Sequence, residues 1–148
     1  MIKNIYLCFI KQISMNSFLV KKHSKEEFYE TYCQWSLLHG FPLANKEMFP
    51  DTALVCYNND LPIYAIWFWF TNSKICIPTF MLSNKGVNYK KRIGGKKALM
   101  LEVINYAKKK KQLLIYCPTT SKEVIETLLE VGFNQGDSDS SQYFLKLV

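Results

Sequence analysis

The sequence predicts an α/β domain of the layered α+β kind, in which a mixed, mostly antiparallel central sheet has helices on both faces. Strand-like runs rich in aromatic and β-branched residues alternate with stretches of helical period, a pattern typical of layered domains. The longest of these runs, LPIYAIWFWF at residues 61–70, is apolar at both alternating sets of positions. Such a strand is covered on both sides. We therefore expect the sheet at the centre, between two layers of helices.

The composition indicates one folded domain with an anionic partner. The chain has 148 residues, and its hydrophobic content of 49% and aromatic content of 15% exclude a disordered chain. The formal net charge of +7 favours a phosphorylated cofactor, nucleic acid or an acidic surface as partner. We expect a single domain over residues 15–148. Residues 1–14 are expected to be an N-terminal extension, with Met15 as an alternative start.

The cysteine and histidine content favours a reduced, metal-free protein. Five cysteines are scattered without a C-x-x-C pair, which is typical of free thiols in the cytoplasm. Two histidines, His23 and His39, give no zinc-binding pattern. No apolar run reaches the length of a membrane span, and the N-terminus lacks the features of a signal peptide. We therefore expect a cytoplasmic protein with no metal and no membrane partner.

A strand and a capped helix are expected first. Residues 18–21 favour a strand, and Ser24 and Glu27 have the spacing of a capping box, in which each side chain bonds the other residue's backbone N–H. The helix then carries apolar residues at helical intervals up to Gly40, namely Phe28, Tyr32, Trp35 and Leu38. A connection containing two prolines follows, with a short helical turn expected at residues 45–48.

A β-hairpin is expected next, with strands at residues 53–57 and 61–70 joined by Asn-Asn-Asp. Trp67 and Trp69 fall on one face of the second strand, and Ile66 and Phe68 on the other. A nucleic-acid site built on the two tryptophans is disfavoured, because rings that alternate with an equally apolar face are buried rather than free for stacking. Residues 74–83 predict another strand.

A basic loop with two glycines precedes the central helix. Residues 90–97 place five cations around Gly94 and Gly95: Lys90, Lys91, Arg92, Lys96 and Lys97. The helix then has Leu99, Met100, Val103, Ile104 and Ala107 on one face. A helix N-terminus suits a phosphate, and glycines let the backbone approach it closely. The alternative is a solvated loop that only keeps the chain soluble.

The last third of the chain predicts a strand, a helix and a final strand. Residues 113–117 favour the first strand, and Thr120 and Glu123 have the spacing of a second capping box. Val124, Leu128 and Val131 form the inner face of the following helix, which ends at Gly132. Residues 142–148 favour the final strand.

On these residues the chain resembles the GNAT superfamily of acetyl-CoA-dependent N-acyltransferases. The pyrophosphate loop of that family, Q/R-x-x-G-x-G/A, aligns with KRIGGK at residues 91–96, and Lys-Ala-Leu follows at residues 97–99. A second signature is a helix that ends in Gly-Phe, here ETLLEVGF at residues 126–133. The element order matches over residues 15–148. Trp35, HGFP at residues 39–42, residues 71–74 and residues 83–84 are similar to small GNAT-like proteins encoded by bacteriophages.

The resemblance implies a GNAT-like sheet and a cofactor, acetyl-CoA or another acyl-CoA. A splayed strand at residues 80–83 would provide an N–H donor for the thioester carbonyl. The implied cofactor-binding residues are Met81, Leu82, Lys91, Arg92, Ile93, Gly94, Gly95, Lys96, Lys97 and Thr120.

The catalytic groups are less clear from the sequence. The resemblance implies a tyrosine general acid in the last helix, but the aligned residue is Leu128, and the strand at residues 75–82 holds no acidic residue. The remaining candidates are Glu47, His39 and Tyr143. His39 is also suited to cap a helix end, and Tyr143 to pack on a strand. Cys117 has no histidine beside it in the sequence, so we interpret it as a core thiol rather than a nucleophile.

Two functions follow. The first is an acyl-CoA-dependent N-acyltransferase that moves an acetyl or other acyl group to an amine on a small molecule or protein. The alternative is a catalytically degenerate GNAT fold, a phage-type binding protein whose basic surface contacts nucleic acid or an acidic protein. Gly94 and Gly95 favour the first, and the missing tyrosine and acid-free strand favour the second. The edge strands leave homodimerisation open.

Overall fold

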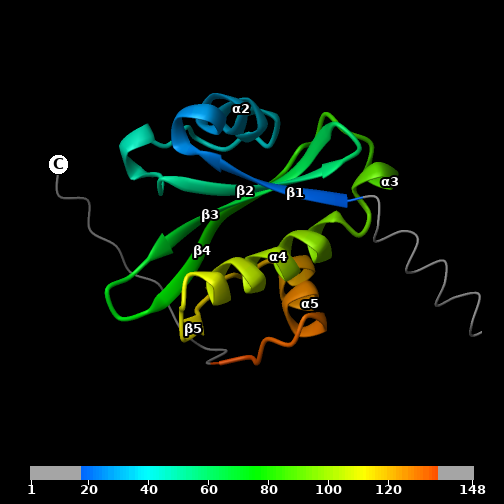
Figure 1. Ribbon diagram of the computed structural model, residues 1–148. Helices are drawn as coiled ribbons and strands as arrows, with labels where there is room; N and C mark the ends of the chain where they lie inside the picture. The colour runs from blue at the N-terminus through cyan, green and yellow to red at the C-terminus, as the bar shows by residue number, and fades with distance from the viewer. Residues whose placement is uncertain (1–17, 137–148) are drawn as a thin grey trace, which may run out of the picture.

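A computed structural model describes residues 18–136 of the chain. Within this range, five strands form one sheet in the order β1-β2-β3-β4-β5 (Figure 1). They are β1 (Phe18–Ser24), β2 (Thr52–Asn58), β3 (Leu61–Phe70), β4 (Ile75–Ser83) and β5 (Leu114–Ile115). Neighbours are antiparallel except β4 and β5, which are parallel. The predicted mixed, mostly antiparallel sheet is confirmed. The expected N-terminal extension and the strand at residues 142–148 lie outside the described residues.

Helices cover both faces of the sheet. The helix α2 (Lys25–Leu38) lies on one face, and α4 (Gly95–Lys109) and α5 (Lys122–Glu130) lie on the other (Figure 1). Two short elements connect them, the 3₁₀ helix η1 (Lys46–Met48) and α3 (Tyr89–Arg92). Among the described residues, no helix is both long and apolar enough to span a bilayer.

The core is divided by β3 into two clusters, as its alternating apolar pattern predicts. Ile66 and Phe68 pack with the buried face of α4, whereas Ala65 and Trp67 pack with the aromatic face of α2. The prediction of cover on both sides fails at the end of the strand, where Trp69 is 42% and Phe70 is 38% exposed. The pattern reports only the polarity of the strand, so it cannot locate the end of the helical layers.

The start of α2 has the predicted capping box. Glu27 N–H donates to Ser24 Oγ over 3.3 Å, and Ser24 N–H donates to Glu27 Oε2 over 2.8 Å. The bond from Ser24 N–H to the carboxylate is the main cause that holds the pKa of Glu27 below its usual value. At the other end Leu38 is 55% exposed, so its predicted place on the buried face is wrong. The helix ends there, and Gly40 follows with a φ of +71°.

Two predictions in the last third of the chain are corrected. The strand expected at residues 113–117 is limited to Leu114–Ile115. The capping box expected of Thr120 and Glu123 is absent, since α5 begins after Ser121 without a side-chain cap bond. Glu123 Oε2 instead accepts a hydrogen bond from Lys96 Nζ over 3.1 Å. A tertiary ion pair has replaced the local contact that the spacing predicts.

Candidate functional site

The site lies where β4 and β5 separate. These strands pair only at Ile75 and Cys76 of β4, and Tyr116 N–H makes one further bond to Cys76 O over 2.9 Å. The chain then turns away through Pro118, whose nitrogen has no hydrogen to donate to a ladder. A cavity of about 610 Å³ opens between the rest of β4 and residues 117–121. Its size lies in the range of small-molecule sites.

A bulge in β4 forms one wall of this cavity. Ala65 and Trp67 of β3 pair with Leu82 and Thr79 of β4, so two steps along β3 correspond to three along β4. Phe80 and Met81 have no partner in this ladder, and Phe80 has a φ of +50°. A bulge of this kind turns backbone groups away from the ladder. Both bulge residues line the cavity.

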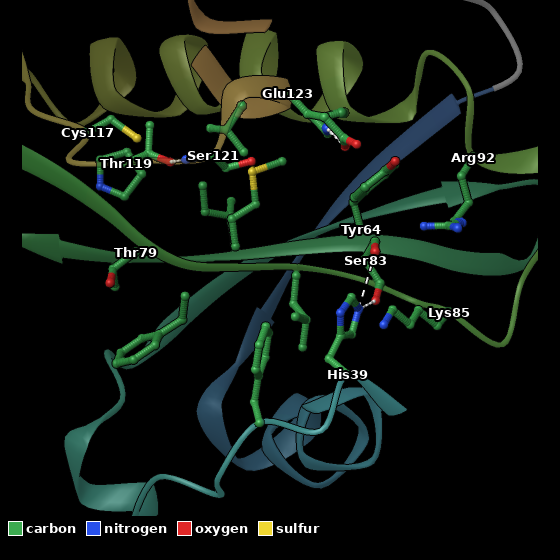
Figure 2. A pocket seen from close by; sticks show the side chains of 18 of the residues that line it. His39, Tyr64, Thr79, Ser83, Lys85, Arg92, Cys117, Thr119, Ser121 and Glu123 are labelled. Carbon is green, nitrogen blue, oxygen red and sulfur yellow. Dashed lines mark hydrogen bonds and ion pairs between the residues drawn. The ribbon is translucent and has the colours of Figure 1, made fainter. Parts of the chain in front are cut away.

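The cavity extends around both sides of β4. Figure 2 shows Arg92 and Glu123 on the side of α4 and α5, and His39 bonded to Ser83 on the side of α2. Thr119 and Ser121, from the loop before α5, lie on the same side as Glu123. The site therefore has two sides that different groups can occupy.

Three cationic side chains, Lys85, Arg92 and Lys96, line the cavity. Arg92 Nε donates to Val87 O over 3.0 Å, which fixes the guanidinium while its terminal nitrogens keep their donors. Lys96 is only 17% exposed and forms the ion pair with Glu123 between the starts of α4 and α5. Arg92 and Lys85 give the cavity positive charge that can attract an anionic ligand.

The two glycines of the basic loop position α4 close to the sheet. Gly94 precedes α4 with a φ of +84°, a conformation that favours glycine. A Cβ on Gly95 would lie 2.4 Å from Ile63 Cδ1 and 3.2 Å from Tyr64 Cδ2, so only glycine lets the helix start directly over β3. Within residues 18–136, no side chain caps this start. The first N–H groups of α4 are therefore available to a ligand.

Only part of the predicted cofactor set lines the cavity. Met81, Leu82, Arg92 and Lys96 do. The other residues of the set lie outside the lining. Lys91, Ile93, Gly94 and Thr120 are exposed, Gly95 is buried as the first residue of α4, and Lys97 pairs with Glu130 over 3.3 Å. The residues on either side of Thr120, which are Thr119 and Ser121, line the cavity instead.

Of the candidate catalytic residues, His39 lies at the site. It follows the last residue of α2, as a helix-end cap should, and its Nε2 is 2.8 Å from Ser83 O. A carbonyl oxygen only accepts hydrogen bonds, so Nε2 carries the hydrogen and Nδ1 has the lone pair in neutral imidazole. Glu47 is exposed on η1, outside the cavity lining. Tyr143 lies outside the described residues.

Leu128 of α5, which the resemblance aligns with a tyrosine, is 7% exposed and packs in the core. It is absent from the lining of the cavity. Cys117 does line the cavity, and burial raises the pKa of its thiol. Because a raised pKa keeps the thiol protonated, this supports its interpretation as a wall residue rather than a nucleophile.

Sequence reasoning missed several lining residues, of which Tyr64 is the clearest. It lies in the apolar run of β3, is 6% exposed and contributes to the cavity wall. Burial raises the pKa of its phenol, although the nearby Arg92 opposes this. Its position beside Ile63 and Ile66 predicts only a core residue. The splayed edge that exposes its ring to the cavity is a tertiary feature with no local signal.

Comparison with solved structures identifies the fold. An aminoglycoside acetyltransferase from an uncultured soil metagenomic sample, in complex with sisomicin, has a TM-score of 0.65 and 8% sequence identity; the match covers 88% of this chain and 98% of that one. The protein has a GNAT-like fold.

Two further structures with a GNAT-like fold extend the comparison. Aminoglycoside acetyltransferase AAC(6')-Iy, in complex with the bisubstrate analogue CoA-S-monomethyl-acetylneamine, has a TM-score of 0.60 and 13% identity, covering 88% of this chain and 99% of that one. A probable acetyltransferase from meticillin-resistant Staphylococcus aureus has a TM-score of 0.58 and 14% identity, covering 86% and 99%. No family model matches the sequence. A search of curated proteins also gives no match.

Proposed function

We propose that this protein is an acyl-CoA-dependent N-acyltransferase of the GNAT superfamily, which transfers an acetyl or other acyl group to an amine. The observation that carries the proposal is the bulge of β4 beside a cavity in the gap between β4 and β5. Two solved structures of similar fold that contain CoA or a CoA-based analogue support it.

The residues at the cavity fit an acyl-CoA. The start of α4 has no side-chain cap, and Gly95 lets it lie directly against β3. Arg92 and Lys85 supply positive charge for phosphates at this side. The gap between β4 and residues 117–121 is a channel for an extended, largely apolar chain, walled by Met81 and Cys117. A bound acyl-CoA would supply the activated acyl group.

The residues of this chain have distinct tasks in such a transfer. The backbone N–H of Met81, in the bulge, is the proposed donor to the thioester carbonyl as negative charge develops there. His39 Nδ1 is the proposed acceptor of the proton that the attacking amine loses, because Nε2 is held by Ser83 O. Positioning the amine on the α2 side of β4, opposite the cofactor, supplies a further share of the rate.

The test is calorimetric titration of the purified protein with acetyl-CoA, with CoA lacking its 3′-phosphate as the control. We expect saturable micromolar binding of acetyl-CoA and weaker binding of the control, because a lost phosphate removes charge-assisted contacts. Absence of binding at millimolar concentration would refute the proposal.

The alternative, a catalytically degenerate fold that serves as a phage-type binding protein, is favoured by one observation. Lys96, at the start of α4, is already paired with Glu123, so its charge is partly neutralised where a pyrophosphate would lie. In this case the exposed lysines of α3 and of the end of α4 would contact an acidic partner. The same titration separates the two, since the binding protein has no need of CoA.

A further inference from the structure

The bulge of β4 contains an unfavourable backbone conformation, which contacts with the surrounding residues must stabilise. Phe80 is a bulky residue at a φ of +50°, a region that costs non-glycine residues conformational free energy. Strain of this kind persists only where the surrounding structure imposes it, and it gathers at functional sites. Phe80 lines the cavity of the proposed acyl transfer.

A buried hydroxyl from a distant helix contacts this residue. Tyr32 of α2 donates from its hydroxyl to Phe80 O over 2.9 Å, across 48 positions of sequence. The ring of Tyr32 is 6% exposed and packs edge-on against Phe49 and Trp67, with centroids 5.2 and 5.8 Å away. Phe49 in turn lies 4.6 Å from the ring of Phe80. The hydroxyl therefore has a fixed position.

Burial raises the pKa of Tyr32 far above that of an ordinary phenol. Burial thus favours the protonated hydroxyl, which is the form that donates to Phe80 O.

The direction of this carbonyl determines the direction of the next N–H. All described peptide bonds are trans. In a trans peptide the C=O and the following N–H point in opposite directions across one plane. Because Phe80 O points to Tyr32 in the cluster beneath α2, Met81 N–H points to the other face, where the cavity is walled by Cys117 and Val124.

We propose that Tyr32 is a positioning residue, which holds the β4 bulge so that the Met81 N–H faces the acyl group. This inference rests on the proposed function for its catalytic consequence, but its structural part does not.

The test compares Tyr32→Phe with Tyr29→Phe in the full-length protein. Tyr29 lies one turn away on the same helix, and its hydroxyl donates to Ala44 O over 2.7 Å, outside the cavity lining. Each variant therefore loses one tyrosine-to-carbonyl bond, and only the first loses the bond to the bulge. The first readout is amide hydrogen exchange at residues 80–82. Loss of one hydrogen bond should accelerate it about tenfold in Tyr32→Phe and not in Tyr29→Phe.

The second readout is turnover of acetyl-CoA, with water or a model amine as acceptor, beside calorimetric titration with CoA. We expect kcat to fall about tenfold in Tyr32→Phe, less than on removal of a direct oxyanion donor, with an unchanged Kd for CoA. Tyr29→Phe should keep the wild-type kcat.

Equal exchange rates at residues 80–82 in both variants would overturn the inference. So would an unchanged kcat in Tyr32→Phe, or a loss of CoA affinity as large as the loss of kcat, because either result leaves no specific effect on the reaction. If the wild-type protein binds no CoA, the proposed function fails, and the exchange comparison alone decides whether Tyr32 holds the bulge.

Discussion

At the scale of single residues, two adjacent cations have different surroundings. Arg92 lines the cavity and its Nε is held by Val87 O. The Lys91 side chain is exposed, and this residue bonds through its backbone, to Asn88 and Asn58. A guanidinium held in place binds a phosphate with less loss of side-chain entropy than a solvated ammonium does. Substitutions of Arg92 and Lys91 are therefore a matched comparison, in which only the first removes a charge at the cavity.

We predict that Arg92→Gln weakens CoA binding by roughly tenfold, as expected for loss of a charge-assisted contact, and that Lys91→Gln has a much smaller effect. Calorimetric titration at low and at physiological salt measures both. The loss for Lys91→Gln should shrink with added salt, because exposed charges are screened. Equal losses for the two variants at physiological salt would contradict the placement of Arg92 at the site.

At the scale of elements, the helices α2 and α4 begin in different ways. The first N–H groups of α2 are satisfied by a capping box, but α4 starts at Gly95 without a side-chain cap. The cap of α2 stabilises that helix, whereas the uncapped start of α4 has N–H groups that a ligand can bond. A prediction for each helix follows.

For α2, we predict that the stabilising effect of the Glu27 carboxylate depends on pH. The pKa of Glu27 is lowered in the folded protein, chiefly by its bond from Ser24 N–H. Its contribution is therefore present above the ordinary glutamate pKa of about 4.3 and is lost as the pH falls through the lower folded value. Urea unfolding should show Glu27→Gln to be less stable than wild type at pH 7 and closer to it at pH 3.

The control for this prediction is Glu30→Gln, an exposed glutamate of the same helix with no ion pair among the described residues. It should follow the wild type at both pH values. A stability difference for Glu27→Gln that stays constant from pH 7 to pH 3 would show that the carboxylate charge has no part in the cap.

For α4, we predict that Gly95→Ala destabilises the protein. The added Cβ would lie 2.4 Å from Ile63 Cδ1, so the fully buried side chain of Ile63 has to shift within the core. Overpacking of this kind costs about 1–3 kcal/mol, more than the helix propensity of alanine at a first-turn position recovers. Gly136→Ala, with no atom within 4 Å of the new Cβ, should change stability by less than about 0.5 kcal/mol. Denaturant unfolding measures both variants.

At the scale of the whole molecule, the lining of the cavity holds more positive than negative charge. Its cations are Lys85, Arg92 and Lys96, and Figure 2 shows Lys85 near His39 and Arg92 closer to α4. The α2 side presents the stacked rings of His39 and Phe41, with Phe80 of β4. Among the described lining residues, the only carboxylate is that of Glu123, which is paired with Lys96. An acceptor with several ammonium groups therefore finds no carboxylate on the α2 side.

We predict that an arylalkyl monoamine is a better acyl acceptor than a linear polyamine. The monoamine can stack on Phe41 and the bulge aromatic, whereas the additional ammonium groups of the polyamine must lose water without an ion partner. A difference on the order of tenfold in kcat/KM is expected, measured as thiol release from acetyl-CoA. A higher kcat/KM for the polyamine would contradict this view of the acceptor side.

Much of the fold was predictable because its signals are local. The spacing of Ser24 and Glu27 specifies a cap, the Asn-Asn-Asp turn specifies a hairpin, and the alternation along β3 assigns Ile66 and Trp67 to opposite faces. Each of these depends on residues within one helical turn or one strand. The failures at Leu38, at the end of β3 and at the start of α5 lie at element ends, where the surroundings decide.

The sequence by itself thus determined the order of elements, the two-sided cover of the sheet and the glycine start of α4. The tertiary structure alone decided the site: the gap between β4 and β5, the bond from Tyr32 to the bulge, and the Lys96–Glu123 pair. The partners in these contacts are 27 to 48 positions apart. Local propensity and period describe a residue's own helix or strand, and they carry no information about which distant group will meet it.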